Sequence, residues 1–327
     1  MGKKIVVTGG AGLIGLEVCK QLNEIGHDVY LFDLGEQIER VRGVIPESVQ
    51  LCCGSILDLS SLRYVLKGCD IVIHLAALLG VNRSERARLR CLEINIDGAK
   101  NVLDCVVQSG VRRIVFASSS EVYGEAIENP ITERTMTQGK TLYAITKLAG
   151  EELCKAYAQL YPMEYTILRY FNCYGPYQTA QFVISKFIKN VMNGHPPKIY
   201  GDGKQIRSYT YVSDTARATV LAALSEKTNS EIYNVGSGDH PISLIDLAEL
   251  VIKMADRNGS MAPQILNGFH GADRLEEREI YARYCDSRKI AMLLDWTPQV
   301  SIEEGLKKVI DNGIIFDGWV NIYDEEM

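Results

Sequence analysis

The chain has 327 residues, of which 46% are hydrophobic and 23% are charged, and its formal net charge is −6. This length and composition are ordinary for an enzyme with one large domain or two lobes. A nucleic-acid partner is not expected, because the chain has no domain-wide excess of basic residues. A membrane partner is not expected either, because no apolar run reaches the length of about 18 residues that a membrane-spanning helix needs.

The cysteines and histidines indicate a reducing compartment and no metal. The nine cysteines, an odd number, occur without any CxxC spacing. Several lie within apolar patterns, which is typical of reduced thiols in a protein core. The first strand begins at the N-terminus without room for a signal peptide, so we expect a cytoplasmic protein. The five histidines show no metal-ligand spacing, and we predict no metal site.

A glycine-rich turn at residues 8–15, with the sequence TGGAGLIG, directly follows the apolar run of residues 5–7. The β-branched run and the apolar periodicity after the turn predict a strand, a turn and a helix. We expect Gly9 to permit the tight turn, Gly12 to let a pyrophosphate approach the backbone, and Gly15 to let the helix pack closely on the strand. The helix N-terminus would supply N–H groups and partial positive charge to phosphates. The GxxGxxG spacing, unlike the commoner GxGxxG, points to one branch of the dinucleotide enzymes.

An acidic residue closes the second predicted strand, at residues 29–32. Asp33 lies roughly 20 residues beyond the glycines, where a carboxylate can accept hydrogen bonds from an adenosine ribose. A 2′-phosphate in that place would meet like charge, and no arginine follows Asp33 immediately. The sequence therefore predicts NAD in preference to NADP. A solvated loop acid is the structural alternative for Asp33.

Strand and helix signals alternate through the first half of the chain. The further predicted strands are residues 49–53, 70–75, 113–117 and 165–168, and the predicted helices are residues 58–67, 91–109 and 141–160. Such alternation is typical of a parallel sheet that is wrapped by helices. We therefore predict an α/β fold with a Rossmann-type, doubly wound parallel sheet.

The regular alternation ends near residue 172, where turn clusters and shorter elements begin. We expect a smaller, discontinuous α/β substrate lobe after this point, with helices near residues 214–225, 244–257 and 302–312. The predicted NAD-binding domain is residues 1–172 with returning segments near 205–235, and the predicted lobe is residues 173–204 and 236–327.

Tyr143 and Lys147 form a YxxxK motif on the predicted helix 141–160, so they share one helix face. The lysine ammonium, together with a positive nicotinamide ring, would lower the pKa of the phenol from about 10. Tyr143 could then take a proton from a sugar hydroxyl while a hydride leaves the same carbon. Ser119, at the carboxyl end of strand 113–117, could hydrogen-bond the reacting oxygen, and Lys147 could hold the nicotinamide ribose. Packing of the tyrosine and turn chemistry of the serine are the structural alternatives.

Several motifs together resemble the extended short-chain dehydrogenase/reductases, and specifically the NAD-dependent nucleotide-sugar epimerase/dehydratase family. The motifs are residues 8–15, 74–77 (HLAA), 118–124 (SSSEVYG), 143–147 (YAITK), 169–176 (RYFNCYGP), 199–203 (IYGDG) and 207–212 (RSYTYV). The resemblance covers essentially the whole chain. It is specific for the family and leaves the reaction within the family open.

The resemblance implies NAD as cofactor, a nucleoside-diphosphate sugar as substrate, and a homodimer joined through helices 93–108 and 143–160. The residues that would contact or frame NAD are Gly9, Gly12, Leu13, Ile14, Gly15, Asp33, Ile56, Asp58, Leu75, Ala76, Ala77, Asn95, Tyr143 and Lys147. The residues that would bind the substrate are Ser119, Ser120, Asn172, Arg207 and Arg283, with the last three at the diphosphate. Arginine suits phosphate because its fork donates two hydrogen bonds at once. Asp58 also fits a helix N-cap.

Glu121 is the residue on which the predicted reaction depends. By the resemblance, 4-epimerases usually carry a small or neutral residue there, whereas 4,6-dehydratases and uronate decarboxylases commonly carry Glu. Once C4 is a ketone the C5 proton is acidic, and Glu121 could remove it. Ser120 stands where many dehydratases place Asp, so an acid for the leaving hydroxyl is not assigned. We predict a 4,6-dehydratase, with a 4-epimerase, a net 4-dehydrogenase and a uronate decarboxylase as alternatives.

Two other questions stay open at this point. A non-catalytic NAD-binding sensor could share the fold, but such relatives typically lose the tyrosine or the lysine, and this chain keeps both. The cluster of Arg83, Arg86, Arg88 and Arg90 could be a solvated face or the edge of a site for an anionic substrate.

Overall fold

The centre of the protein is a parallel sheet of seven strands in the order β11-β6-β5-β4-β1-β2-β3. The computed structural model describes residues 2–256, 259, 261–269, 276 and 279–318. The strands of this sheet are β1 (Lys4–Thr8), β2 (Asp28–Asp33), β3 (Gln50–Cys53), β4 (Ile71–His74), β5 (Arg113–Ser119), β6 (Glu164–Tyr170) and β11 (Glu231–Val235). The predicted α/β class with a doubly wound sheet is confirmed.

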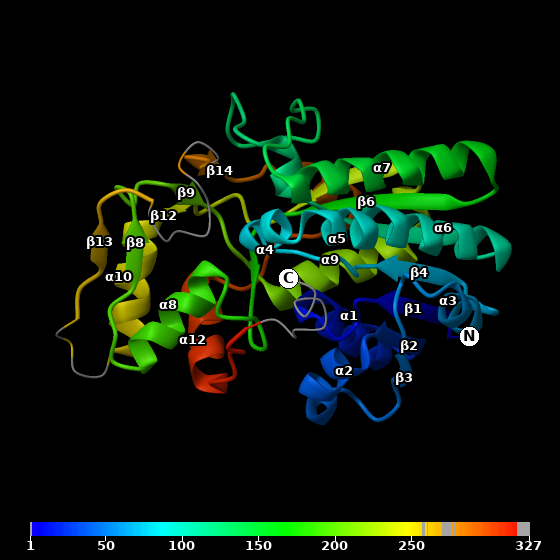
Figure 1. Ribbon diagram of the computed structural model, residues 1–327, viewed down its shortest axis with the longest axis horizontal. Coiled ribbons are helices and arrows are strands. Elements are labelled where there is room, and N and C mark those ends of the chain that lie inside the picture. Colours follow the sequence, from blue (N-terminus) through cyan, green and yellow to red (C-terminus); the bar gives the residue numbers. More distant parts are fainter. Residues whose placement is uncertain (1, 257–258, 260, 270–275, 277–278, 319–327) are drawn as a thin grey trace.

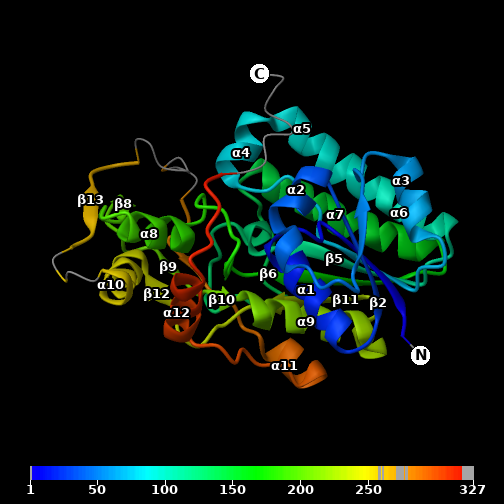
Figure 2. The same cartoon turned by 90° about the horizontal axis from the view of Figure 1, so that it is seen from below.

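Helices cover both faces of the sheet, because its central strands are apolar on both sides (Figures 1 and 2). One face packs on α1 (Leu13–Glu24), α2 (Gly35–Val41), α9 (Val212–Leu224) and α11 (Arg288–Leu294). The other face packs on α3 (Leu59–Leu66), α5 (Arg88–Leu92), η2 (Glu93–Asp97), α6 (Gly98–Gln108) and α7 (Leu142–Leu160). Asp58 caps α3, since its carboxylate accepts from the Ser60 backbone N–H at 2.9 Å, as its predicted N-cap role requires.

The strand order reverses between β1 and β4, each of which pairs in parallel with the other. The chain runs outward from this point to β2 and β3 on one side and to β5, β6 and β11 on the other. Ligands bind outside the carboxyl ends of strands at such a switch point. The ends of β1 and β5 carry the glycine-rich turn and Ser119, so both lie at the expected crevice.

A smaller group of elements lies beside the sheet (Figure 1). Its helices are α8 (Val183–Met192), α10 (Leu244–Ala255) and α12 (Ile302–Asn312), which share an apolar core. Its strands are β7 (Cys173–Tyr174), β8 (Lys198–Tyr200), β9 (Ile206–Arg207), β10 (Thr210–Tyr211), β12 (Ile242–Ser243), β13 (Gln264–Leu266) and β14 (Ala282–Arg283). They form three small sheets, β10-β7, β12-β9-β14 and β13-β8.

The division into two domains remains a prediction, although two segments bear on its boundaries. Strand β11 completes the large sheet, in the range where the sequence places a returning segment. Residues 288–296, which the sequence places in the lobe, pack instead against the sheet: Ile290 and Trp296 are buried in its core.

The short remaining helices are η1 (Arg42–Val44), α4 (Val81–Arg86), η3 (Ser120–Tyr123) and η4 (Glu226–Thr228). No helix in the described part of the chain is both long enough and apolar enough to cross a bilayer.

Candidate active site

The glycine-rich turn has the three properties that a bound pyrophosphate needs. Gly9 has a φ of +71°, and a Cβ there would lie 2.6 Å from the Ala76 backbone nitrogen. A Cβ on Gly15 would lie 2.2 Å from the Gly9 carbonyl oxygen, so α1 can pack this closely only with glycine. A Cβ on Gly12 would meet, among the described residues outside its own stretch of chain, the Gly9 carbonyl oxygen at 3.2 Å and nothing else within 4 Å, and the position faces the cavity. The backbone therefore fits NAD, with an open approach at the N-terminus of α1.

Asp33 is fixed beside this turn by two backbone hydrogen bonds. Its carboxylate accepts from the Ala11 N–H at 3.0 Å and from the Leu34 N–H at 2.8 Å. Burial raises the pKa of Asp33 to about 6, although these two hydrogen bonds act in the opposite direction. With a pKa of about 6 the carboxylate is mostly ionised at pH 7, and it is held where it can accept hydrogen bonds from an adenosine ribose.

One cavity of about 710 Å³ contains most of the predicted site residues. The predicted residues that line it are Gly9, Gly12, Leu13, Ile14, Gly15, Asp33, Ile56, Leu75, Ala76, Ala77, Ser119, Ser120, Glu121, Tyr143, Lys147, Asn172 and Arg283. The fold thus brings the glycine-rich turn together with the YxxxK motif. A ligand in this cavity can touch both.

Tyr143, Lys147 and Ser119 meet at the end of β5. Tyr143 is the second residue of α7, which is capped by Thr141, and Lys147 follows about one turn later. The Lys147 Nζ donates to the Ala117 carbonyl oxygen at 2.8 Å and lies 5.7 Å from the centre of the Tyr143 ring. Burial lowers the pKa of Lys147 to about 8. The lysine is therefore anchored on β5, within reach of both the phenol and the cavity.

The expected lowering of the Tyr143 pKa is not found in the protein without NAD. Tyr143 is partly exposed to the cavity, yet burial raises the pKa of its phenol, and the Glu121 carboxylate acts in the same direction. A hydrogen bond with Ser119 acts the other way without overcoming burial. In the absence of NAD, Lys147 therefore does not offset the effect of burial on the pKa of this phenol. The prediction also counted on the positive charge of nicotinamide to lower the pKa of the phenol, and that charge is present only when NAD is bound.

Glu121 and Arg283 form a buried ion pair, which the sequence did not predict. The Arg283 Nη1 lies 2.6 Å from the Glu121 Oε1, and the two side chains are 6% and 11% exposed. Glu121 comes from η3, directly after β5, and Arg283 from β14 in the smaller group of elements. Within the described residues the Arg283 Nε is buried without a hydrogen-bond partner. Arg283 therefore places a positive charge against the carboxylate beside Tyr143.

Three predicted site residues do not line the cavity. Asp58 uses its carboxylate on the backbone and side chain of α3. Asn95 lies in the π-helical turn η2 and holds the Leu78 backbone, accepting from its N–H at 2.7 Å and donating to its carbonyl at 3.0 Å. Asn95 thereby positions a loop that lines the cavity.

Arg207, predicted to bind the diphosphate, is committed elsewhere in this structure. Its guanidinium donates to Glu279 at 3.0 Å and to the Ile280 carbonyl at 2.5 Å. These contacts join β9 to the segment before β14, and the side chain is 10% exposed. A diphosphate would have to displace them, which the position of Arg207 in the sequence could not reveal. Asn172 does line the cavity, and its amide donates to the Ser208 carbonyl at 2.9 Å.

Sequence reasoning missed a buried polar network behind the site. Arg169 on β6 donates twice to Glu151 on α7, at 2.9 and 2.6 Å, and once to the Tyr123 hydroxyl at 2.9 Å. Glu151 also accepts from the Ser118 hydroxyl at 2.5 Å, and Tyr123 donates to Asn234 at 2.7 Å. The network ties the middle of α7 to the end of β5, and these two elements carry the predicted catalytic residues Ser119, Tyr143 and Lys147. Its sequence signal is a glutamate four residues after Lys147, on the same helix face.

The arginine cluster divides between cavity and surface. Arg83 and Arg86 line the cavity. Arg88 is ion-paired with Glu85 at 2.5 Å on the helix surface, and Arg90 is ion-paired with Glu93, also at 2.5 Å. The solvated-face alternative thus describes Arg88 and Arg90, whereas the role of Arg83 and Arg86 toward an anionic substrate stays a prediction.

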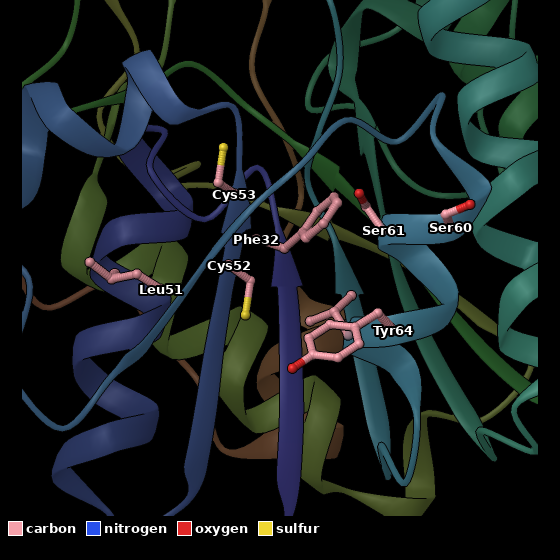
Figure 3. A pocket seen from close by; sticks show the side chains of 8 residues that line it. Phe32, Leu51, Cys52, Cys53, Ser60, Ser61 and Tyr64 are labelled. Atoms are coloured by element: carbon pink, nitrogen blue, oxygen red, sulfur yellow. The ribbon is translucent and has the colours of Figure 1, made fainter.

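A second cavity, of about 430 Å³, lies between β3 and α3 (Figure 3). The Phe32 ring, the thiols of Cys52 and Cys53, and Tyr64 surround it. None of its lining residues belongs to the predicted site. Among the residues that the structure describes, no group of three His, Cys, Asp or Glu side chains could hold a metal ion, and His270 lies outside them.

Comparison with known proteins identifies the family. A profile of the NAD dependent epimerase/dehydratase family matches residues 5–236. A UDP-N-acetyl-alpha-D-glucosaminuronate decarboxylase of Bacillus cytotoxicus is 35% identical, over 95% of this chain and 97% of that protein. The match therefore extends through the smaller group of elements as well as the sheet.

Two solved structures have the same fold over nearly their full length. A UDP-glucose 4-epimerase of Thermotoga maritima, solved with UDP-glucose, is 30% identical with a TM-score of 0.85, covering 95% of this chain and 98% of that one. MoeE5, solved with UDP-glucuronic acid and NAD, is 30% identical with a TM-score of 0.83 and the same coverage. Together with the glycine-rich turn and the YxxxK motif in one cavity, these matches show that the chain belongs to the NAD-dependent epimerase/dehydratase family and is an enzyme of the extended short-chain dehydrogenase/reductase class.

Proposed function

We propose that this protein binds a nucleoside-diphosphate sugar and oxidises its C4 hydroxyl to a ketone. The observation that carries the proposal is the single cavity in which Ser119, Tyr143 and Lys147 face the glycine-rich turn and Asp33. The names of the similar proteins support the substrate class, since one was solved with UDP-glucose and another with UDP-glucuronic acid.

The roles of the three residues follow from their positions. Ser119 donates to the reacting sugar oxygen, and Tyr143 takes the proton of the C4 hydroxyl. Bound NAD supplies the hydride acceptor and a positive ring. Lys147, anchored on the Ala117 carbonyl, stabilises the phenolate electrostatically once the positive ring offsets the cost of burial. Tyr143 is therefore a base only in the complex with NAD.

We propose 4,6-dehydration as the overall reaction, with Glu121 at C5. The C4 ketone makes the C5 proton acidic, and Glu121 lies beside Tyr143 in the cavity. Glu121 takes the C5 proton, and the C5–C6 double bond forms as the C6 hydroxyl takes a proton from solvent and leaves as water. Glu121 then returns its proton to C5, and the hydride held by the reduced coenzyme would go to C6, so the cycle is redox-neutral. Arg283 must release Glu121 for this step, because an ion-paired carboxylate is a weak proton acceptor.

The same ion pair favours 4-epimerisation as a second candidate. If Arg283 stays on Glu121, the C5 proton remains in place and the hydride returns to the other face of C4. The UDP-glucose 4-epimerase among the similar structures supports this alternative. Uronate decarboxylation is supported by the similarity to the Bacillus cytotoxicus decarboxylase and by Arg83, Arg86 and Arg283 in the cavity lining.

Product mass distinguishes these reactions in one experiment. The purified protein is incubated with UDP-, GDP-, dTDP- and CDP-sugars and their uronates, and the products are separated by mass spectrometry. Loss of one water means dehydration, loss of carbon dioxide means decarboxylation, an unchanged mass with a new stereoisomer means epimerisation, and loss of two hydrogens with NADH means net oxidation. Failure of every sugar to react would refute the proposed activity and favour the non-catalytic alternative.

The role of Glu121 has its own control. Glu121→Gln should abolish water loss but still give the 4-keto sugar, because the residues that oxidise C4 are intact. Glu125→Gln is the matched variant: Glu125 lies outside the cavity lining and pairs with Lys140 at 3.8 Å. If Glu121→Gln dehydrates as fast as Glu125→Gln, Glu121 is not the C5 base.

We also propose a homodimer formed through α6 and α7 and a cytoplasmic location. Ile145 and Leu160 on α7 are 51% and 74% exposed, and their spacing places them on roughly the same side of the helix. All nine cysteines are free thiols, which suits a reducing compartment. Light scattering tests the dimer: wild type should have twice the monomer mass and Leu160→Glu should not.

A further inference from the structure

The chain after α12 crosses from the smaller group of elements to the NAD-binding side (red in Figure 2). We call residues 314–318 the C-terminal strap. It is held by backbone hydrogen bonds on the loop after β7: the Tyr177 N–H donates to the Ile314 carbonyl at 2.9 Å, and the Phe316 N–H donates to the Gln178 carbonyl at 3.1 Å. The Ala180 N–H in turn donates to the Phe316 carbonyl at 2.8 Å. The strap is thus paired along its length.

A second set of contacts ties the strap to α2. The Arg40 guanidinium lies 4.0 Å from the centre of the Phe316 ring, and its Nη2 donates to the Gly318 carbonyl at 2.9 Å. Helix α2 begins at Gly35, two residues after Asp33, so Arg40 follows the predicted ribose-binding carboxylate by less than two helical turns. The strap therefore reaches the adenosine side of the site.

Further contacts fix the strap at its other edge. Asp317 is ion-paired with Lys189 on α8. The Phe316 ring packs on the Tyr177 ring with centroids 6.3 Å apart, and Lys20 of α1 lies 5.7 Å from the Tyr177 centroid. Tyr177 has a φ of +68°, an unfavourable backbone conformation for a bulky residue, which the hydrogen bond to Ile314 helps to maintain. Contacts to α1, α2 and α8 therefore fall on three neighbouring side chains, Tyr177, Phe316 and Asp317.

Phe316, Tyr177 and Arg40 line the same cavity as Gly12 and Asp33. We propose that Arg40 and Phe316 form a latch that retains NAD in this protein. The need for a latch is chemical: a reaction that returns its hydride within one cycle fails if the reduced coenzyme leaves first. The inference rests on the NAD-binding part of the proposed function and holds for dehydration, decarboxylation and epimerisation alike.

The expected size of the effect follows from the contact. A cation over an aromatic face contributes more when it is shielded from water, and Arg40 is partly buried. Loss of the Arg40–Phe316 contact should accelerate NADH release by roughly fivefold to thirtyfold, with little change in the association rate. Arg40→Met and Phe316→Leu should not add in the double variant, because they break the same contact.

The test measures coenzyme release without any sugar. Protein loaded with NADH is mixed with excess NAD, and loss of bound-NADH fluorescence gives the dissociation rate; the NAD that copurifies is measured after denaturation. Arg42→Met is the matched control, because Arg42 lies two residues beyond Arg40, binds the exposed Glu39 and is absent from the cavity lining.

The outcomes separate the latch from the proposed reaction. Faster release and less copurified NAD in Arg40→Met and Phe316→Leu, with Arg42→Met like wild type, support the latch. Release rates of both variants within about twofold of wild type would overturn it, whatever the protein does to sugars. Phe316→Leu keeps an apolar side chain, so a folded protein is available for the measurement, and circular dichroism verifies it.

Discussion

Removal of the Glu151 carboxylate should destabilise the protein more than removal of any surface ion-pair partner. Glu151→Gln leaves the Arg169 guanidinium without its counter-charge in a place where the two side chains are 5% and 1% exposed. Breaking such a buried pair from one side typically costs about 3–5 kcal/mol, because a buried charge remains uncompensated. At about 2 °C per kcal/mol for a protein of this size, the melting temperature should fall by roughly 6–10 °C.

The structure supplies two comparisons for this experiment. Glu39→Gln breaks a short ion pair with Arg42 whose side chains are 62% and 59% exposed, and it should leave the melting temperature unchanged. The double variant Glu151→Leu with Arg169→Met removes both charges and should recover at least half of the loss, since apolar replacement of a buried pair is often nearly neutral. Tyr123 keeps its partner Asn234 in that variant.

Thermal and urea unfolding of the NAD-free proteins give the result. The reasoning is refuted if Glu151→Gln melts within about 1 °C of wild type. It is also refuted if the double variant loses as much stability as the single variants Glu151→Leu and Arg169→Met lose in sum. Either result would mean that the Arg169–Glu151 pair does not act as one buried unit.

Two further predictions concern the coenzyme. Burial raises the pKa of Asp33 to about 6, and only the carboxylate can accept both ribose hydrogen bonds, so NAD affinity should fall as pH is lowered through about 6. Asp33→Asn should bind NAD weakly at every pH, and calorimetric titration checks both results. Gly12→Ala should keep the wild-type melting temperature but bind NAD more weakly, whereas Gly15→Ala should lower the melting temperature itself, since its Cβ would lie 2.2 Å from the Gly9 carbonyl oxygen. A wild-type affinity in Gly12→Ala would contradict the close approach of phosphate to that glycine.

The sheet and the coenzyme side could be predicted from the sequence because their signals are local. Buried parallel strands are continuous apolar runs, and the turn after β1 and the N-cap at Asp58 are defined by adjacent residues. The YxxxK motif places Tyr143 and Lys147 on one helix face in the same way. The strands, the glycine-rich turn, the Asp58 cap and the YxxxK motif could therefore be placed from neighbouring residues in the sequence.

The rest depends on contacts between distant segments. Two-residue strands such as β9 and β14 carry no periodicity, so the pairing that places Arg283 against Glu121 leaves no local signal. The same is true of Arg207, whose partners come from the segment before β14. The raised pKa of Tyr143 in the protein without NAD has a related cause, because burial of the phenol depends on tertiary packing that a motif does not report.

The most direct test of the central claim is a rapid-mixing measurement with Tyr143→Phe. Protein loaded with NAD is mixed with the sugar nucleotide that turns over in the panel, and the absorbance of the reduced nicotinamide reports the coenzyme in the first turnover. We expect wild type to show this absorbance and Tyr143→Phe, with unchanged NAD content, to show a rate at least about 100-fold slower. Equal rates in the two proteins would contradict the assignment of Tyr143 as the base for C4 oxidation.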